Sequence, residues 1–442
     1  MAAPRARTVR DPVWQNIPLD PVAAAIVDAP QFQRLRRVKQ LGFAHLAYPG
    51  AVHTRFLHAL GVYHLTRRAI ETLGRSGALE KLSADERAEI PVVRLAALLH
   101  DVGHYAFSHA MEELEPESIP GHHEEVAARF LEAPPIRAAL EGVHPEAPSR
   151  IAELIRGRSR HPLQGLVSGS LDLDKIDYLR RDSLFCGVPY GAVDVERLLD
   201  SLTLAREVPE APLEVAVTEK GISALESLLF SKYQMFRNVY WHHTVRAATA
   251  AFRRLVERAL ACRALEREEL PGRTDEELMN LLARRLENGT GPPILRALLA
   301  ALVDRRLPKR VLELFGDDLP SGGAPWVETH PELVRRLEDR LAREWGLAGG
   351  SVILDYPTDP RMLRLHLLLV RRRGEVRRLT STGEEGLIDL PRLSQSLLHT
   401  TRVFRIFALE TMSPKDPRPI LELLEDSASG VAARLDEDRP LS

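Results

Sequence analysis

Apolar residues recur at intervals of three and four along most of the chain, the spacing of a helix with one buried face. The segment that follows Asp28-Ala29-Pro30 shows it clearly, and a helix is expected there until Gly42. Its basic residues Arg34, Arg36, Arg37 and Lys39 are expected on a solvated surface. The same pattern predicts helices at the end of residues 11–28, in 53–73, from about 91 onward, after 125, and in 166–183, 222–264, 274–287, 294–303 and 331–345.

Strand signals are few and lie mostly in the second half of the chain. PLEVAVT (212–218) alternates and predicts one short strand, and SVILDYP (351–357) predicts another. RLHLLLVRRRGEVRRLTS (364–381) predicts a hairpin that turns at Arg373-Gly374, and residues 428–442 are expected to be frayed. We therefore predict a mainly α protein with a helical core in residues 1–265 and a smaller α+β C-terminal lobe in residues 266–442.

Composition narrows the class of protein without naming a function. The formal net charge is −2, so there is no global basic field of the kind that drives non-specific nucleic-acid binding, and nucleic acid is not expected as a partner, although a local basic patch stays open. The 2 cysteines exclude a disulfide framework, and no apolar run is long enough for a membrane span. The N-terminal residues lack the apolar stretch of a signal peptide. A cytoplasmic enzyme or binding protein that does not contact membranes is expected.

Candidate chemistry gathers in the stretch VVRLAALLHDVGHYAFSH, where an apolar helix leads to His100-Asp101 and then to His104 and His109. A continuing helix would put His100 and His104 on one face. The simpler interpretation is a buried helix end whose polar groups are satisfied by backbone. Three histidines and an aspartate so close together favour a functional site instead, because a metal or an anion would give several buried polar groups partners at once.

Polar residues in two other helices extend this candidate site. His58 lies among apolar residues, and a lone histidine in such a position is usually a core residue. Asp172 and Asp174 are two apart in LDLDKIDYLRRDS, so they must point in different directions; alone, this segment indicates an exposed, salt-bridged helix. Combined, His58, His100-Asp101 and Asp174 supply two imidazoles and two carboxylates. That donor set suits a divalent first-row transition metal.

The sequence around these residues resembles the HD-domain metal-dependent phosphohydrolases, in particular their deoxynucleoside triphosphate (dNTP) triphosphohydrolase branch. Five ordered blocks in residues 10–250 carry the resemblance. They are DAPQFQRLRRVKQLG, YPGAVHTRFLHALGVYHL, ALLHDVGHYAFSH, HHEE and LDLDKIDYLRRD. The resemblance implies hydrolysis of a dNTP to deoxynucleoside and inorganic triphosphate, by attack at the α-phosphorus. It also implies a helical HD-domain core.

The resemblance also implies roles for individual residues. His58, His100, Asp101 and Asp174 would bind the metal, which would be Mn, Fe, Ni or Zn, while Mg²⁺ would accompany the nucleotide. His104 and His123 would act at the phosphate, with His123 as the proton donor to the leaving oxygen. Glu112 stands where the family often has the aspartate that orients this histidine, so the contact here would come from a longer side chain.

Substrate contacts are implied in the same way. Arg55 matches an arginine at the α-phosphate, Asp182 a carboxylate that binds the 3′-hydroxyl, and Tyr240 an aromatic that rejects a 2′-hydroxyl. The remaining implied substrate residues are Gln40 and Leu41 near the sugar and base, Lys175, Tyr178, Lys232 and Arg237 near the phosphates and sugar, and His109 in the pocket. Lys232 stands where some members have arginine, so its phosphate contact would be monodentate.

Regulation by nucleotide is implied as well. Asp28 and Arg36 lie in a block that, in several relatives, binds an activating nucleotide between subunits. The partner residues would come from the C-terminal lobe, where Arg402 and Arg405 are candidates. A homo-oligomer, either a tetramer or a dimer, is therefore expected, and low concentrations of one nucleotide are expected to stimulate hydrolysis of others.

Two other functions stay open on the sequence. One is an HD-type phosphodiesterase or nuclease that acts on single-stranded or cyclic nucleotides; salt-sensitive binding to oligonucleotides would favour it. The other is a non-catalytic nucleotide sensor. No expected metal ligand or catalytic histidine is missing from the chain, which favours an enzyme.

Overall fold

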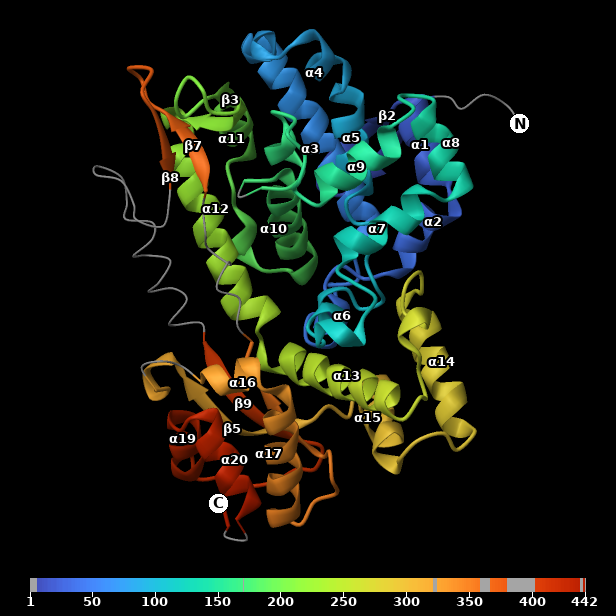
Figure 1. The fold of residues 1–442 in the computed structure, drawn as a ribbon, viewed down its shortest axis with the longest axis vertical. Coiled ribbons are helices and arrows are strands. Elements are labelled where there is room, and N and C mark those ends of the chain that lie inside the picture. Colours follow the sequence, from blue (N-terminus) through green and yellow to red (C-terminus); the bar gives the residue numbers. More distant parts are fainter. Residues whose placement is uncertain are drawn as a thin grey trace.

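The protein is mainly helical, with three small sheets among the residues that the structure describes. This computed structural model describes residues 6–169, 171–320, 324–357, 366–379, 402–437 and 440–441. A helical body fills the upper part of Figure 1, and a smaller lobe of helices and strands lies below it. The predicted fold class, a helical core with an α+β C-terminal lobe, is confirmed.

The upper body holds the first half of the chain. Its helices are α1 (Pro21–Asp28), α2 (Pro30–Gln33), α3 (Arg55–Arg75), α4 (Ala84–Ala88), α5 (Ile90–Leu99), α6 (His109–Glu112), α7 (His123–Leu131), α8 (Pro134–Glu141), α9 (Ala147–Ile155), α10 (Leu173–Cys186), α11 (Val195–Asp200) and α12 (Ile222–Met235). Helix α3 is central, because it packs against both α5 and α10. Its apolar face contributes to one large core with residues from most of these helices.

Two of the sheets belong to this body. Strands β1 (Arg7–Asp11) and β2 (Gln15–Leu19) form an antiparallel hairpin before α1. The second sheet has the order β3-β4-β7-β8, from β3 (Leu202–Ala205), β4 (Glu214–Thr218), β7 (Leu367–Val370) and β8 (Val376–Leu379). Strand β4 pairs in parallel with β7, so residues from both sides of the predicted boundary at 265 share one sheet. The boundary itself stays a prediction.

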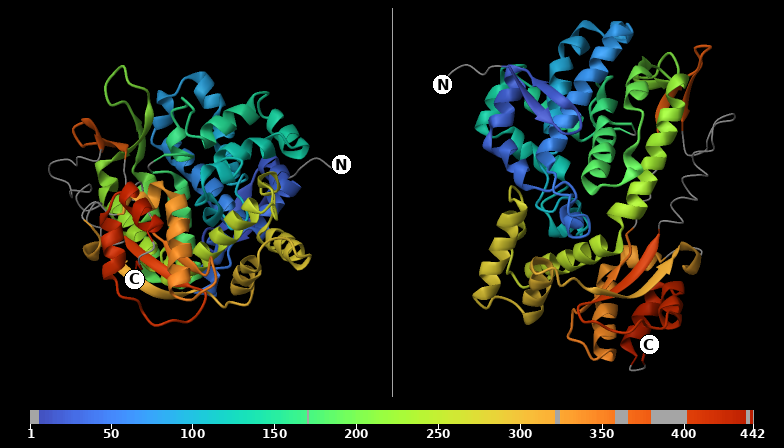
Figure 2. Two further views of the ribbon diagram at one scale, coloured as in Figure 1. Left: turned by 60° about the horizontal axis from the view of Figure 1, so that its bottom comes forward. Right: turned by 180° about the vertical axis from the view of Figure 1, so that it is seen from behind.

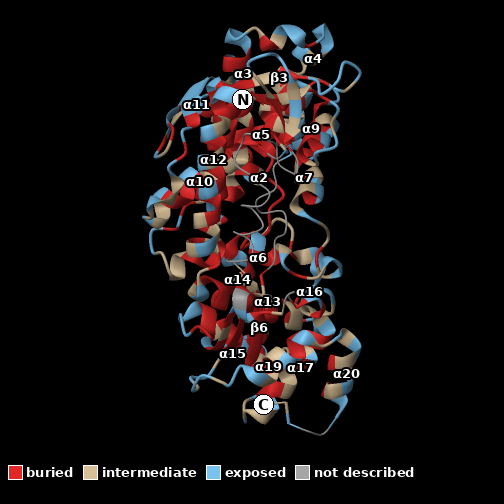
Figure 3. Ribbon diagram, turned by 90° about the vertical axis from the view of Figure 1, so that its left-hand side faces the viewer, coloured by how far each residue is buried: buried red, intermediate tan, exposed pale blue. Residues whose placement is uncertain are grey.

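Below the body, α13 (His243–Ala261) runs between the two parts of the molecule (Figures 1 and 2). The lobe contains the sheet β5-β9-β6, and α14 and α15 lie to one side of it. These elements are α14 (Asp275–Glu287), α15 (Pro293–Val303), β5 (Lys309–Phe315), α16 (Pro325–Thr329), α17 (Pro331–Glu344), β6 (Val352–Asp355), β9 (Val403–Ala408), α19 (Arg418–Glu425) and α20 (Ala428–Asp436). Buried residues line the inward faces of the helices in both parts, as the colouring in Figure 3 shows.

Most helices expected from periodicity are present, but two expectations are wrong. The helix expected from Pro30 to Gly42 ends at Gln33 and continues as a 3₁₀ turn, because other segments bind its later backbone groups. The amide of Lys39 donates to Asp275, and the amide of Gln40 donates to the carbonyl of His53. The helix expected in residues 222–264 is broken between α12 and α13 by a π-helical turn, Phe236–Tyr240, after which the His242 imidazole caps α13.

The strand expectations are correct for β4, β6 and the β7–β8 hairpin, which turns at Gly374. Strands β1, β2, β3, β5 and β9 were not expected, and the frayed end expected from residue 428 is wrong, because α20 begins there. Residues 364–365, 380–381 and 438–439 of the expected segments lie outside the described residues. Among the described residues, no helix has both the length and the apolar character that a membrane span requires.

Candidate metal site and catalytic cavity

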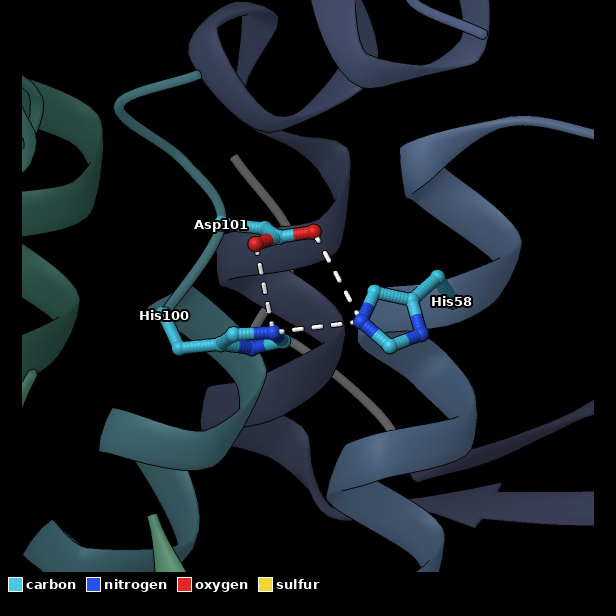
Figure 4. Close-up of side chains that lie close together, drawn as sticks. All are labelled: His58, His100 and Asp101. Atoms are coloured by element: carbon cyan, nitrogen blue, oxygen red, sulfur yellow. Dashed lines mark hydrogen bonds and ion pairs between the residues drawn. The ribbon is translucent and has the colours of Figure 1, made fainter. Parts of the chain in front are cut away.

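Three elements bring the expected metal ligands together. Helix α3 carries His58, the turn after α5 carries His100 and Asp101, and the first turn of α10 carries Asp174. His58 Nε2 lies 3.3 Å from His100 Nε2 and 3.7 Å from Asp101 Oδ2 (Figure 4). Asp174 Oδ1 closes the group, at 2.8 Å from His58 Nε2 and 3.8 Å from His100 Nε2.

Hydrogen bonds behind the cluster fix the orientation of both imidazoles. His58 Nδ1 donates to Asp177 Oδ2 at 2.7 Å, and His100 Nδ1 donates to the carbonyl of Ala97 at 2.9 Å. A carboxylate and a carbonyl only accept, so each ring keeps Nε2 directed at the cluster. Asp177 is itself held by Trp14 Nε1 and by two nitrogens of Arg181, all of them buried. No role was assigned to Asp177 from the sequence, so its place behind His58 was missed.

The electrostatics of this cluster favour a bound cation. Burial opposes charge on His58, but the carboxylates of Asp174 and Asp177 outweigh it and raise the pKa of His58 to about 10. Burial is likewise outweighed at His100, where the charges of Asp101 and Asp174 raise the pKa above its usual range. The donor set therefore fits a divalent transition metal, which would replace protons on the imidazoles. When bound, such an ion would lower the pKa of a water molecule and polarise a phosphoryl oxygen.

The turn that carries His100 and Asp101 is not helical, so the expected shared helix face of His100 and His104 is wrong. Helix α5 ends at Leu99, and the guanidinium of Arg34 binds the carbonyls that the turn leaves free. Arg34 donates to the Val102 carbonyl at 2.7 Å and to the His104 carbonyl at 2.9 Å. The expectation that Arg34 is solvated is wrong as well, since its side chain is buried to make these bonds.

Gly103 lets α7 approach the same turn closely. A Cβ atom at Gly103 would lie 2.1 Å from the His123 carbonyl and 2.5 Å from the Ala127 nitrogen, both of them backbone atoms. The turn and the first turn of α7 are thus in direct backbone contact. This contact sets the distance between His104 and His123.

Replacing Gly103 by alanine should therefore push α7 away and destabilise the fold by ~3 kcal/mol, at the upper end of the usual cost of overpacking. Denaturant unfolding measures the change. Gly74→Ala is the matched control, because its Cβ would meet only Leu79 Cδ1 at an ordinary 3.6 Å within helix α3. The control should be neutral or slightly stabilising. Equal stability of the two variants would contradict the close contact at Gly103.

Two more histidines form a second group next to the metal cluster. The rings of His104 and His123 stack with centroids 3.8 Å apart and planes 16° from parallel. His104 Nε2 lies 3.1 Å from Asp101 Oδ1, and His123 Nδ1 lies 2.5 Å from Glu112 Oε1. Asp101, His104 and His123 lie near enough to one another to share an ion. The rings of His104 and His123 are stacked, however, so their in-plane lone pairs are parallel and do not point at one ion. This second group is therefore a poorer candidate for a metal site than the first.

The two stacked imidazoles have opposite proton affinities. Burial and the charges of Arg55 and His123 push the pKa of His104 well below its usual range. At His123 burial acts in the same direction, but the charge of Glu112 and its hydrogen bond outweigh it and raise the pKa to about 9. A neutral His104 thus faces a protonated His123, which is the form that a proton donor requires.

Arg55 joins the metal cluster to the loop that follows it. Its guanidinium donates to Asp101 Oδ2 at 2.7 Å and to Ser108 Oγ at 2.9 Å, and Nη2 lies 3.2 Å from His109 Nε2. Phe107 and Ser108 both have positive φ, 56° and 48°, which is costly for residues with side chains.

The strained loop is anchored by a residue far along the chain. The Phe107 amide donates to Asp275 Oδ1 at 2.8 Å, and Asp275 Oδ2 accepts the amide of Lys39 at 3.0 Å. The first residue of α14 thus holds two loops of the site at once. This role could not be predicted from the sequence, in which Asp275 is an ordinary acidic residue in the first turn of a helix.

A cavity of about 1200 Å³ opens beside the cluster. It is lined by all the expected catalytic residues, by three of the four expected metal ligands, and by most of the expected substrate residues. The expected residues along it are Gln40, Leu41, Arg55, His100, Asp101, His104, His109, Glu112, His123, Asp174, Lys175, Tyr178, Asp182, Lys232 and Tyr240. His58, the fourth ligand, lies fully buried behind it.

Three expected residues lie elsewhere. Arg237 is exposed, donates to the Tyr233 hydroxyl at 2.9 Å and does not line the cavity, so its place near the phosphates stays a prediction. Asp28 pairs with Arg7, and Arg36 lies over the ring of Phe56, both outside the cavity. Their regulatory role stays a prediction.

Within the α10 segment, the two aspartates point in different directions, as expected. Asp172 caps α10 by accepting the amide of Lys175 and also pairs with the Lys175 ammonium at 2.6 Å, whereas Asp174 faces the metal cluster. Further along α10, Asp182 Oδ2 accepts the Tyr240 hydroxyl at 2.7 Å. Burial and the charge of Asp182 raise the pKa of Tyr240 well above its usual range, so this hydroxyl stays protonated.

The C-terminal lobe contacts residues 107–113, which we call the catalytic loop, through Arg246. Its guanidinium bonds both oxygens of Glu113, at 2.7 and 2.9 Å, and both oxygens of Asp355 in β6, at 3.0 and 2.6 Å. Glu113 follows Glu112, the partner of His123. The lobe is therefore connected to the catalytic loop by a bidentate ion-pair network, in which Arg246 and Asp355 are buried and which the sequence did not indicate.

HD-type proteins have a helical core with a candidate cation site at its centre. In this chain the site is formed by α3, by the His-Asp turn that ends α5, and by α10. Residues 55–182 match the HD domain family, and residues 193–384 match the HD associated region. The chain belongs to the HD-domain family, as the sequence predicted.

Relatives come from all domains of life. The chain is 31% identical to an uncharacterized protein of Methanocaldococcus jannaschii over 95% of its own length and 82% of that protein. It is 32% identical to YwfO of Bacillus subtilis over 57% of this chain and 56% of that one. It is 29% identical to human deoxynucleoside triphosphate triphosphohydrolase SAMHD1 over 53% of this chain and 42% of that protein.

Solved structures share the fold. A phosphohydrolase from Bacteroides thetaiotaomicron superposes with a TM-score of 0.69 at 23% identity, over 92% of this chain and 100% of that chain. A hypothetical protein from Aquifex aeolicus superposes with a TM-score of 0.65 at 26% identity, over 91% and 96% of the two chains. The HD-domain phosphohydrolase fold thus extends over most of this chain, including the C-terminal lobe.

Proposed function

We propose that this protein hydrolyses deoxynucleoside triphosphates to deoxynucleoside and inorganic triphosphate. One observation carries the proposal: a single cavity is lined by ligands of the metal cluster, by a protonated histidine–glutamate pair and by the buried Asp182–Tyr240 pair. The first two features suit hydrolysis of a phosphate ester, and the third suits recognition of a sugar. The similarity to SAMHD1, whose name states this activity, supports the same substrate class.

In this proposal the bond between the α-phosphorus and the 5′-oxygen breaks while water adds to phosphorus. The leaving oxygen takes its proton from His123, whose charge is maintained by Glu112. His104 and Arg55, which both contact Asp101, would bind the reacting phosphate from the side of the metal cluster. Fixed cations matter here because phosphoryl transfer depends mostly on positioning and charge neutralisation.

Lys175 and Lys232 line the same cavity and would neutralise the rest of the triphosphate. Asp182 would accept a sugar hydroxyl, and Tyr240, bonded to Asp182, would lie beneath the sugar and leave no room for a 2′-hydroxyl. Gln40 and Leu41 line the end of the cavity formed by residues 40–44 and would contact the sugar and base. The Gln40 side-chain oxygen is buried and lacks a hydrogen-bond partner among the described residues, which suits a contact with a ligand.

Incubation with each dNTP, singly and in mixtures, with Mn²⁺ or Mg²⁺ tests the proposal. Chromatography should separate deoxynucleoside and inorganic triphosphate as the two products. Absence of both products under every metal and nucleotide mixture would overturn the proposal. Cleavage of oligonucleotides or cyclic nucleotides in parallel reactions would then indicate an HD-type phosphodiesterase or nuclease.

A further inference from the structure

His53 lies directly behind the sugar side of the cavity and does not line it. The imidazole is buried, with 2% of the residue exposed, and it stacks on Phe185 with ring centroids 4.6 Å apart. Its Nε2 lies 2.7 Å from Asp182 Oδ1. The carbonyl of His53 accepts the amide of Gln40, so this residue supports the cavity through both its side chain and its backbone.

The hydrogen bonds around Asp182 give both carboxylate oxygens a fixed donor. Oδ1 accepts from His53 and Oδ2 accepts from the Tyr240 hydroxyl, each at 2.7 Å. Because a carboxylate only accepts, His53 must carry its proton on Nε2. Its Nδ1 is buried and has no hydrogen-bond partner among the described residues, so the neutral Nε2–H form is the one that leaves no donor unpaired.

A carboxylate held at both oxygens cannot rotate, and its remaining lone pairs keep one direction. Asp182 is almost fully buried yet lines the cavity, so those lone pairs are available only to a ligand that donates a hydrogen bond. A sugar hydroxyl is such a donor. A sugar without that hydroxyl would leave a buried charged acceptor unsatisfied, which costs more than the hydrogen bond itself contributes.

We propose that His53 is a positioning residue that holds Asp182 in place and thereby sets the selection of substrates that carry a 3′-hydroxyl over those that lack it. The inference rests on the proposed function, because it assigns the hydroxyl to a deoxynucleotide. Without His53, Asp182 would keep only its bond to Tyr240 and could turn away from the sugar. Loss of His53 should then harm the hydroxylated substrate more than its 3′-deoxy analogue.

The test compares kcat/KM for a dNTP and for the 2′,3′-dideoxy analogue with the same base, in the wild-type protein and in two variants. His53→Ala should reduce the ratio of the two values by about 10- to 100-fold, the range expected for a hydrogen bond to a charged group. His53→Gln, whose side-chain amide can donate to Asp182, should recover part of the ratio. Because both substrates meet the same protein sample, any loss of folded protein cancels in the ratio.

Phe185→Leu is the matched control, since it removes the stacked ring and leaves the bond between His53 and Asp182. Its ratio should equal that of the wild-type protein. Equilibrium dissociation constants of the two nucleotides for metal-free protein give a second measurement that needs no turnover. An unchanged ratio in His53→Ala, or a wild-type protein that does not distinguish the two nucleotides, would overturn the role of His53. A wild-type protein that binds dNTPs selectively but never hydrolyses them would overturn the proposed function alone.

Discussion

Asp101→Asn should bind little divalent metal and should hydrolyse dNTPs at least about 10³-fold more slowly than the wild-type protein, since a catalytic metal contributes several kcal/mol. Asp101 is central to the cluster, because its oxygens approach His58, His100, His104 and Arg55. Asparagine keeps the shape and removes the charge, so the effect would report on electrostatics and coordination. Elemental analysis after dialysis measures the bound metal.

The same experiment has a matched control in Asp172→Asn. Asp172 lies two residues before the ligand Asp174, but it caps α10 and does not face the cluster. Asparagine is as good a helix cap as aspartate, so metal binding should be kept. Loss of metal from both variants would contradict the assignment of the cluster, because it would show that removing any negative charge from this region abolishes metal binding.

Proton release gives an independent measure of the same site. At pH 8 His58 is protonated in the metal-free protein, since its pKa is about 10, and a metal ligand must be deprotonated. Metal binding in a weakly buffered solution should therefore release about one proton or more per site. The release should diminish as pH rises through about 10. Stoichiometric metal binding without proton release would contradict the part played by His58.

His123→Ala should lower the rate by about 10²- to 10⁴-fold, the usual contribution of a positioned acid or base, while metal binding stays intact. The pH profile carries more information than the rate. The required protonated form of His123 exists below its pKa of about 9, so wild-type kcat/KM should fall as pH rises through about 9. His123→Ala should lack this alkaline limb.

Glu112→Gln should shift the alkaline limb of the kcat/KM profile to lower pH, although His123 itself is retained. The charge of Glu112 is what overcomes burial at His123, so its removal lets burial lower the pKa, and activity should be lost at a lower pH than in the wild-type protein. His144→Ala, at a histidine outside the cavity, is the control and should leave the profile unchanged. An unshifted alkaline limb in Glu112→Gln would show that this limb does not belong to His123.

The sequence identified most of the residues that the structure brings together at the candidate site, but it did not identify the residues behind them, for a physical reason. Expected ligands such as His100 and Asp101 lie in short, ordered blocks, so their residue types and spacing are enough to identify them from the sequence. The residues that orient them, such as Trp14 and Arg34, come from segments far along the chain and are ordinary buried or basic residues in isolation. Arg34 was expected in solvent because its carbonyl partners, in the turn after α5, are not visible in a sequence.

A similar limit explains the differences in fold. Periodicity found the long helices, but the end of a helix is decided by backbone partners as well as by side-chain pattern. The chain between Met235 and His243 contains no glycine or proline to mark the break that its π-helical turn makes. The strands β3, β5 and β9 were not expected, although β5 has 7 residues and β9 has 6, because pairing with distant partners determines them more than their own residues do.

The anchoring of the catalytic loop by Asp275 bears on the order in which the protein folds. The bond from Phe107 to Asp275 spans 168 residues, that from Lys39 to Asp275 spans 236, and that from Arg246 to Asp355 spans 109. Contacts between distant residues form late, because the entropy of closing long loops must be overcome first. The helices α3, α5 and α10 can therefore form early from local contacts, whereas the site becomes complete only near the end of folding. A fragment limited to residues 55–182 would contain every metal ligand and lack the residues that hold their loops.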